Sequence, residues 1–229
     1  MIGRTSILRL VLPAFLCLLS LSCFDYEERI VLAPNFSGYV DIEYTVPIYN
    51  SEDRSLVEFL PADQAKVERK YERLINEKRV SIDNFTRTIQ PATGQEEAFQ
   101  RTATVKYRIQ FLNAQDLETI LIGKTTVVQR GGRLQILRSF PVGASLPVNS
   151  GRISRRLHEL TLKTLHRRSM KFTILYPWYY DLLTNHGSIV KPGFEFFQLP
   201  LETTMQGGGP GSIVWSIDFK ANLEPRASP

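Results

Sequence analysis

The side chains best suited to chemistry in this chain of 229 residues do not form a catalytic pattern. The three histidines, His158, His166 and His186, include no H-E-x-x-H metal motif. His158 and His166 are eight residues apart on a predicted helix, so one metal ion cannot bind both. The chain has no G-x-S-x-G hydrolase motif, and the glycine run at 207–211 lacks the Gly-Lys-Ser/Thr of a phosphate loop. We therefore predict no catalytic residue, no metal site, no cofactor and no enzymatic activity.

Positive charge gathers in one segment of the chain. From Arg152 to Lys171 there are seven basic residues and one acidic residue, a local net charge of +6 in a chain whose total is +5. On a helix, five of these basic side chains lie within an arc of about 120°, namely Arg152, Arg155, Arg156, Lys163 and Arg167. Such a helix can bind an anionic lipid surface, with about 1 kcal/mol for each engaged Lys or Arg. The alternative is a helix that packs its leucines on a sheet and solvates its cations.

A second candidate surface is aromatic. Trp178, Tyr179 and Tyr180 follow directly on a predicted strand. Aromatic side chains beyond the end of a strand can lie at a membrane interface or stack on sugars. The alternative is that these residues close one end of the hydrophobic core.

The first 23 residues have the pattern of an export signal. Arg4 and Arg9 precede an apolar run of 12 residues, which is too short to cross a bilayer core of about 30 Å as a helix. The run ends in Leu19-Ser20-Leu21-Ser22-Cys23, which resembles the lipobox of bacterial lipoproteins, in the looser form of spirochaetal proteins. The resemblance implies cleavage before Cys23 and acylation of that residue by a fatty acid such as palmitate. The alternative is an ordinary cleavable signal with an incidental cysteine.

Cleavage at this site would leave Cys23 as the one cysteine of the mature chain, because Cys17 lies in the signal. An intramolecular disulfide and a cysteine nucleophile would then both be excluded. Export also argues against nucleic acid as the partner of the basic segment. We expect residues 1–22 to be a lipoprotein signal peptide, residues 23–220 a single domain and residues 221–229 a disordered tail.

Alternation of apolar and polar residues predicts most of the regular structure as strands, at 37–46, 102–111, 125–129, 134–137, 171–176 and 212–219. Gly131 and Gly132 predict a tight two-residue hairpin turn. Helical periodicity predicts two longer amphipathic helices, at 61–78 and 152–168, and a short helix at 113–122. The expected fold class is α+β, with an antiparallel β-sheet packed on one face by the two longer helices.

Four motifs follow one another along the predicted domain. They are the opening strand 37–40, the strand and acidic turn 111–117, the strand end with its Pro and Asn at 175–187, and the closing strand around Trp215. This order resembles the LppM-like lipoprotein domain of bacterial envelopes, across most of residues 24–220. The resemblance implies an envelope location and contact with lipid, and it brings no catalytic residues.

Together these features predict a non-catalytic lipoprotein of the bacterial envelope, anchored in a membrane by acylated Cys23. The basic helix is expected to bind anionic lipid or another envelope polyanion. A structural or protein-interaction module with an envelope protein as partner is the second hypothesis. An enzyme acting on cell-wall or lipid substrates is the third, and it would need a cleft that gathers scattered Asp, Glu or His residues.

Overall fold

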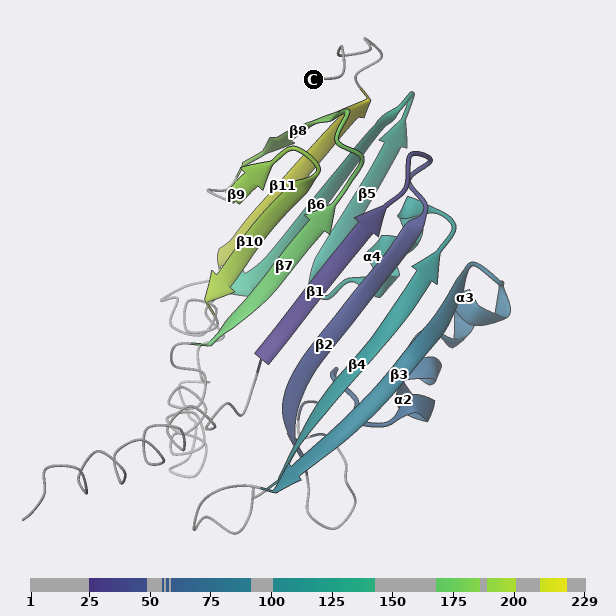
Figure 1. Ribbon diagram of the computed structural model, residues 1–229, viewed down its shortest axis with the longest axis vertical. Helices are drawn as coiled ribbons and strands as arrows, with labels where there is room; N and C mark the ends of the chain where they lie inside the picture. The colour runs from purple at the N-terminus through teal and green to yellow at the C-terminus, as the bar shows by residue number, and fades with distance from the viewer. Residues whose placement is uncertain are drawn as a thin grey trace, which may run out of the picture.

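The computed structural model describes residues 25–48, 55, 57, 59–91, 101–142, 168–185, 189–200 and 211–221. Within these ranges the chain forms two β-sheets and a few short helices (Figure 1). Cys23, the predicted basic residues from Arg152 to Arg167, and residues 222–229 of the predicted tail lie outside the described residues.

The larger sheet has seven strands in the order β3-β4-β2-β1-β7-β10-β9. β1 and β7 pair in parallel, and the other neighbours pair antiparallel. The strands are β1 (Asp25–Leu32), β2 (Gly38–Ile48), β3 (Val80–Pro91), β4 (Arg101–Phe111), β7 (Ser169–Leu175), β9 (Ile189–Lys191) and β10 (Phe194–Pro200). The one parallel pair lies inside the sheet, so it sets the relative direction of the two antiparallel halves.

The smaller sheet has four antiparallel strands in the order β5-β6-β11-β8. They are β5 (Lys124–Arg130), β6 (Arg133–Val142), β8 (Tyr180–Thr184) and β11 (Gly211–Ala221). The predicted hairpin between β5 and β6 is confirmed, because Gly131 and Gly132 both have positive φ angles, 51° and 79°.

The helices are short. They are α2 (Gln64–Lys70), α3 (Glu72–Asn76), the 3-10 helix η2 (Ala114–Asp116) and α4 (Leu117–Ile120). The predicted helix at 61–78 is therefore two helices that meet at Tyr71, whose φ of −112° is not helical. Its apolar stripe is confirmed, since Val67, Tyr71 and Leu74 are all buried.

The predicted fold class is wrong. The described part of the protein is mostly β, and the inner face of the larger sheet is covered by the smaller sheet together with α2, α3 and α4 (Figure 1). β5, β6 and β11 were predicted as strands of the same sheet as β2, β4 and β7, whereas they form the second sheet that covers its inner face. Five further strands, β1, β3, β8, β9 and β10, were not predicted. In β1 the alternation of Tyr26, Ile30 and Leu32 is interrupted by a glutamate, Glu28, at a core position.

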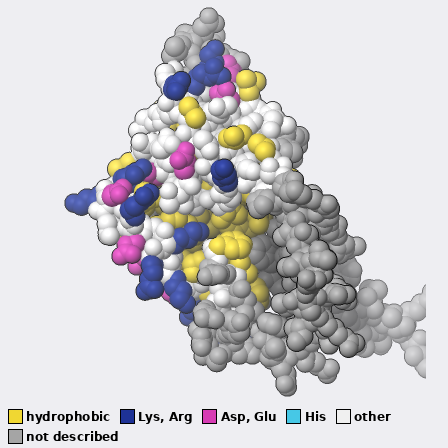
Figure 2. All heavy atoms as spheres, turned by 180° about the vertical axis from the view of Figure 1, so that it is seen from behind, with side chains coloured by type: hydrophobic (Ala, Val, Ile, Leu, Met, Phe, Trp, Pro, Cys, Tyr) yellow, Lys and Arg dark blue, Asp and Glu magenta, His cyan; other side chains and the backbone are white. Residues whose placement is uncertain are grey.

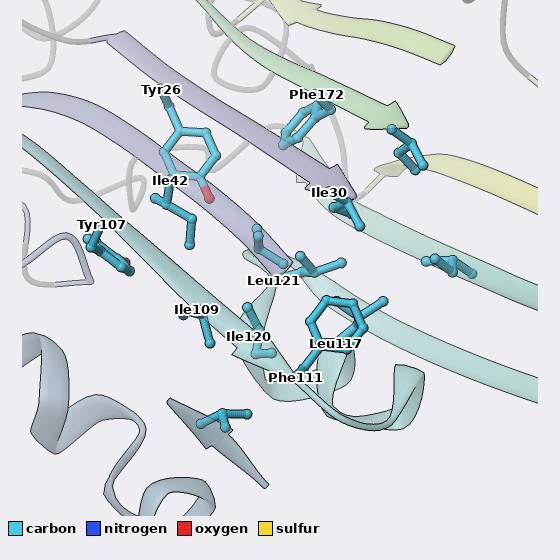
Figure 3. Close-up of a cluster of buried hydrophobic side chains, with 14 of the residues drawn as sticks. Tyr26, Ile30, Ile42, Tyr107, Ile109, Phe111, Leu117, Ile120, Leu121 and Phe172 are labelled. Atoms are coloured by element: carbon cyan, nitrogen blue, oxygen red, sulfur yellow. The ribbon is translucent and has the colours of Figure 1, made fainter. Parts of the chain in front are cut away.

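The core lies between the larger sheet and the elements that cover it. Figure 3 shows Ile42, Ile109 and Phe111 of the larger sheet in one cluster with Leu117 and Ile120 of α4. All five side chains are buried. The predicted inward faces of β2 and β4 are thus confirmed, and burial of such side chains from water is the main force that holds the layers together.

A charged pair also lies in this core. Glu28 of β1 and Arg138 of β6 both have 0% exposure. Arg138 Nη1 donates to Glu28 Oε1 at 2.7 Å, and Nη2 donates to Oε2 at 3.2 Å, so the pair joins the two sheets through two parallel hydrogen bonds. Tyr26 donates a further hydrogen bond to Glu28 at 3.0 Å, and the guanidinium lies 4.5 Å from the ring centre of Phe172.

We predict that Arg138→Met destabilises the protein by about 3–5 kcal/mol, because it leaves the Glu28 carboxylate buried without its cation. The double variant Glu28→Leu, Arg138→Met should recover most of that loss, because neither charge then remains. Urea unfolding measures both. The control is Lys106→Met, which breaks the exposed 2.9 Å pair with Glu43 and should change stability by no more than about 1 kcal/mol. Equal effects of Arg138→Met and Lys106→Met would contradict this account.

Candidate functional site

The described residues that directly follow the two predicted membrane segments lie at one end of the larger sheet. β1 begins at Asp25 and β7 begins at Ser169, and their parallel pairing puts both starts at the same end, which we call the Asp25 end. Arg168 Nη1 lies 3.7 Å from Asp25 Oδ1. Cys23 precedes Asp25 by two residues, and Arg168 is the last residue of the predicted basic helix. The first described residues at the C-terminal ends of the two predicted membrane segments, Asp25 and Arg168, therefore lie side by side.

The aromatic candidates lie at the opposite end, which we call the Trp178 end. β1 and β7 run together from the Asp25 end for 8 and 7 residues, a rise of about 25 Å. The turn from β7 to β8 follows, with Trp178 exposed at 56% and Tyr179 at 37%, whereas Tyr180 is exposed at only 9%. The sequence predicted one surface made of these three residues, whereas in the structure Trp178 and Tyr179 are exposed and Tyr180 is buried.

Tyr180 closes the core. Its hydroxyl donates to the Pro34 carbonyl at 2.8 Å, and its ring centre lies 5.4 Å from that of Phe36. Burial raises the pKa of Tyr180, and the neighbouring Tyr179 adds to the rise. Tyr180 therefore stays a neutral hydrogen-bond donor and belongs to the interior, not to an exposed aromatic surface.

Trp178 and Tyr179 lie in a turn that begins at Tyr176, and Tyr176 is hydrogen-bonded to residues at the turn from β9 to β10; we call it the braced turn. The Tyr176 backbone N–H donates to the Gly193 carbonyl at 3.1 Å, and the Tyr176 hydroxyl donates to the Lys191 carbonyl at 3.1 Å. Gly193 has a φ of +76°, and a Cβ there would lie 3.1 Å from the Tyr176 carbonyl oxygen. Burial raises the pKa of Tyr176, and Glu195 adds to the rise, so the hydroxyl keeps its proton for this hydrogen bond. The exposure of the two rings is thus fixed by the fold.

Charges of both signs surround the Trp178 end. Arg133 donates to Asp218 at 2.6 Å, and Lys220 is in register with Asp181 on the neighbouring strand. Viewed from behind, Lys and Arg side chains lie beside Asp and Glu side chains near the top of the molecule (Figure 2). Among the described residues at this end, these cations therefore lie beside acids and do not form a surface of positive charge alone.

The outer face of the larger sheet has a shallow groove of about 410 Å³, lined mainly by charged side chains. Asp41 accepts from Arg108 at 2.6 Å, and Glu43 lies 2.9 Å from Lys106. These acids and bases neutralise one another across the strands. Within the described ranges, no group of three or more His, Cys, Asp or Glu residues is placed to hold a metal ion. In the same ranges, no helix has the length and apolarity needed to cross a bilayer.

Four buried charged side chains were not predicted from the sequence. Glu28, Arg138, Asp116 and Glu195 are all buried, and Glu195 accepts a 3.1 Å hydrogen bond from Trp215 Nε1 across the two sheets. The available signal was the position of Glu28 and Arg138 in otherwise alternating strands, where a charged side chain at an inward position requires a buried partner.

The chain has two tryptophans, and their fluorescence should report separately on the exposed turn at Trp178 and on the buried core at Trp215. Trp178→Phe should remove the acrylamide-quenchable part of the fluorescence and change stability by less than about 0.5 kcal/mol, since it alters an exposed side chain. Trp215→Phe, at a residue with 0% exposure, should leave quenching unchanged and lower the unfolding midpoint. Quenching that survives in Trp178→Phe would contradict the division between an exposed and a buried tryptophan.

Comparison with known proteins gives a family and several structural similarities. A search of curated proteins found no match. The chain is similar to the folded domain of LppM from Mycobacterium tuberculosis, with 11% identity, a TM-score of 0.44, and coverage of 90% of this chain and 94% of that one. It is also similar to yeast LTA4 hydrolase, with 11% identity, a TM-score of 0.30, and coverage of 90% of this chain and 31% of that one. A family model described as LIC11874-like matches residues 18–223, and the chain therefore belongs to the LIC11874-like family.

Proposed function

We propose that this protein is a non-catalytic lipoprotein of the bacterial envelope, anchored by acylated Cys23, which binds anionic lipid or another envelope polyanion through its basic segment. The observation that carries the proposal is the contact of Arg168 with Asp25, 3.7 Å apart at the starts of two parallel strands. The family match supports it as well, because the matched residues 18–223 include the lipobox-like sequence before Cys23.

The arrangement suits a two-part membrane attachment. The acyl chains on Cys23 would hold the chain at the membrane, and a basic patch would add attraction to anionic lipid. A basic segment that joins the fold beside the anchor has a high effective concentration at the membrane, because the anchor already holds it there. Three or four engaged cations at about 1 kcal/mol each would then matter.

Acylation predicts that cells which express the full chain incorporate labelled palmitate into the protein, and that Cys23→Ser incorporates none. The measurement is the label on the purified protein, because Cys23→Ser also removes the cleavage site and so keeps the apolar signal. Cys17→Ser is the matched control, because Cys17 lies in the predicted signal and its loss should leave the labelling unchanged. Equal labelling of the Cys23→Ser protein would contradict acylation as the anchor.

The basic segment predicts salt-sensitive binding of residues 24–229 to phosphatidylglycerol vesicles in co-sedimentation, and no binding to phosphatidylcholine vesicles. A variant with Arg152, Arg155, Arg156 and Lys163 changed to Glu should lose this binding. The matched control changes four cations that lie away from the Asp25 end to Glu, namely Arg130, Arg133, Lys191 and Lys220. It has the same total charge as the first variant and should still bind the vesicles.

Equal binding by the two charge variants would contradict lipid recognition by the basic segment. If a protein also co-purified with the unchanged domain, the second hypothesis, a protein-interaction module, would be favoured. One observation supports that alternative: Trp178 and Tyr179 are held in an exposed, braced turn at the end of the sheet away from Asp25, and Trp and Tyr are enriched among residues that dominate protein interfaces.

A further inference from the structure

The strand β3 forms one edge of the larger sheet. Among the described strands it pairs with β4 alone. The Leu112 N–H donates to the Arg79 carbonyl at 3.3 Å, one position before the ladder begins at Val80. Because residues of an antiparallel strand direct their backbone groups alternately to its two sides, Val80 and Ile82 direct their N–H and C=O groups away from β4. These backbone groups can pair with an added strand.

The other edge strands of the two sheets are shorter or covered. β8 and β9 have five and three residues, against 12 in β3. At β5 the Val127 N–H donates to Glu118 Oε1 at 2.7 Å, so a side chain of α4 occupies that edge. Short strands and bulges are ways in which proteins protect sheet edges. β3 has a bulge between Asp83 and Thr86, and residues 80–83 before it are the regular part of its edge.

A groove of about 530 Å³ lies beside this regular part. α2 and α3 lie next to β3 (Figure 1), and their side chains line the groove together with those of β3. The Arg79 N–H donates to the Leu74 carbonyl at 2.9 Å, which holds α3 against the start of β3. In a strand added to β3, every second side chain would face the helices. The apolar side chains that it would meet are those of Ala65, Ile75, Val80 and Ile82.

The charges of the groove favour a basic ligand. Glu68 and Glu72 line it with one base, Arg69, and all three side chains are exposed. Glu68 accepts a 2.8 Å hydrogen bond from Gln64, a neutral amide that leaves the carboxylate charge in place. A Lys or Arg side chain in the groove would therefore meet two carboxylates and one guanidinium, which is a net attraction.

We infer that β3 and the groove beside α2 and α3 bind an extended peptide segment of a partner protein. The segment adds a strand at residues 80–83 and places a Lys or Arg side chain near Glu68 and Glu72. Pairing at a sheet edge, with alternate side chains held beside it, is a recurrent way to bind an extended peptide. The inference goes beyond the proposed function and does not depend on acylation of Cys23.

A second copy of this chain is a less suitable occupant of the edge. Its own β3 would bring its own α2 and α3, because these helices lie next to the strand (Figure 1). Two pairs of helices would then meet over one joined edge. A single extended segment pairs with β3 without bringing helices to the groove.

The probe is a phage-displayed library of random peptides that each contain one fixed Lys. The library is selected on protein purified in detergent micelles from cells that express the full chain. Selected peptides are synthesised with a fluorescent label, with the fixed Lys or with Glu in its place, and binding is measured by anisotropy. The groove variant is Glu68→Lys with Glu72→Lys. The matched control, Glu27→Lys with Glu43→Lys, makes the same change of charge at two exposed acids of the groove on the outer face of the larger sheet.

Binding of the Lys peptides should be at least about tenfold weaker in the groove variant and little changed in the control. Replacement of the peptide Lys by Glu should weaken binding to the unchanged protein in the same way. Hydrogen exchange followed by mass spectrometry should show that a bound peptide protects residues 79–83 and leaves β5 unchanged. Equal exchange of β1 in the three proteins without peptide shows that each variant is folded.

Three results would overturn the inference. The first is equal binding of the peptides by the groove variant and the control. The second is a selection that yields no binding peptide, or peptides that protect a different part of the chain. The third is protection of residues 79–83 that rises with protein concentration in the absence of peptide, which would indicate a second copy as the occupant.

Discussion

The ion pair between Glu28 and Arg138 is the polar contact around which the two layers are aligned. Both side chains have 0% exposure, and their two hydrogen bonds, at 2.7 and 3.2 Å, connect the central region of the larger sheet to the smaller one. Such a pair adds little net stability over well-packed apolar residues, because removing two charges from water is costly. Its contribution is directional: only one relative placement of the sheets lets the guanidinium meet the carboxylate. Apolar contacts alone tolerate small shifts, and this pair does not.

The aromatic packing around the pair follows from that placement. The Arg138 guanidinium lies 4.5 Å from the ring centre of Phe172 in the larger sheet and 5.7 Å from that of Trp215 in the smaller one. Trp215 in turn stacks on Phe197 at 4.9 Å and donates to Glu195. The contacts of Arg138 with Phe172 and of Trp215 with Phe197 and Glu195 cross between the sheets, so they depend on the same alignment.

The same two residues explain where sequence reasoning succeeded and where it failed. Strands with uninterrupted alternation, β2 and β4, were predicted within a few residues, and so was the hairpin at Gly131 and Gly132. β1 was missed because Glu28 occupies an inward position, and β6 was predicted to end one residue before Arg138, although it continues to Val142. The exposure of Trp178 and the burial of Tyr180 depend on contacts with Gly193 and Pro34, far away in sequence. The approach of Arg168 to Asp25 depends on a parallel pairing of distant strands, which no local pattern records.

The account assigns different roles to the two ends of one sheet, attachment at the Asp25 end and display of a braced aromatic turn at the other. Its central claim is the covalent anchor at Cys23, because the basic segment acts at a membrane only if the chain is held there. Mass spectrometry of the N-terminal peptide, from protein extracted from membranes with detergent, tests this claim most directly. The account predicts a peptide that begins at Cys23 and carries acyl chains. A peptide that begins elsewhere, or an unmodified Cys23, would contradict it.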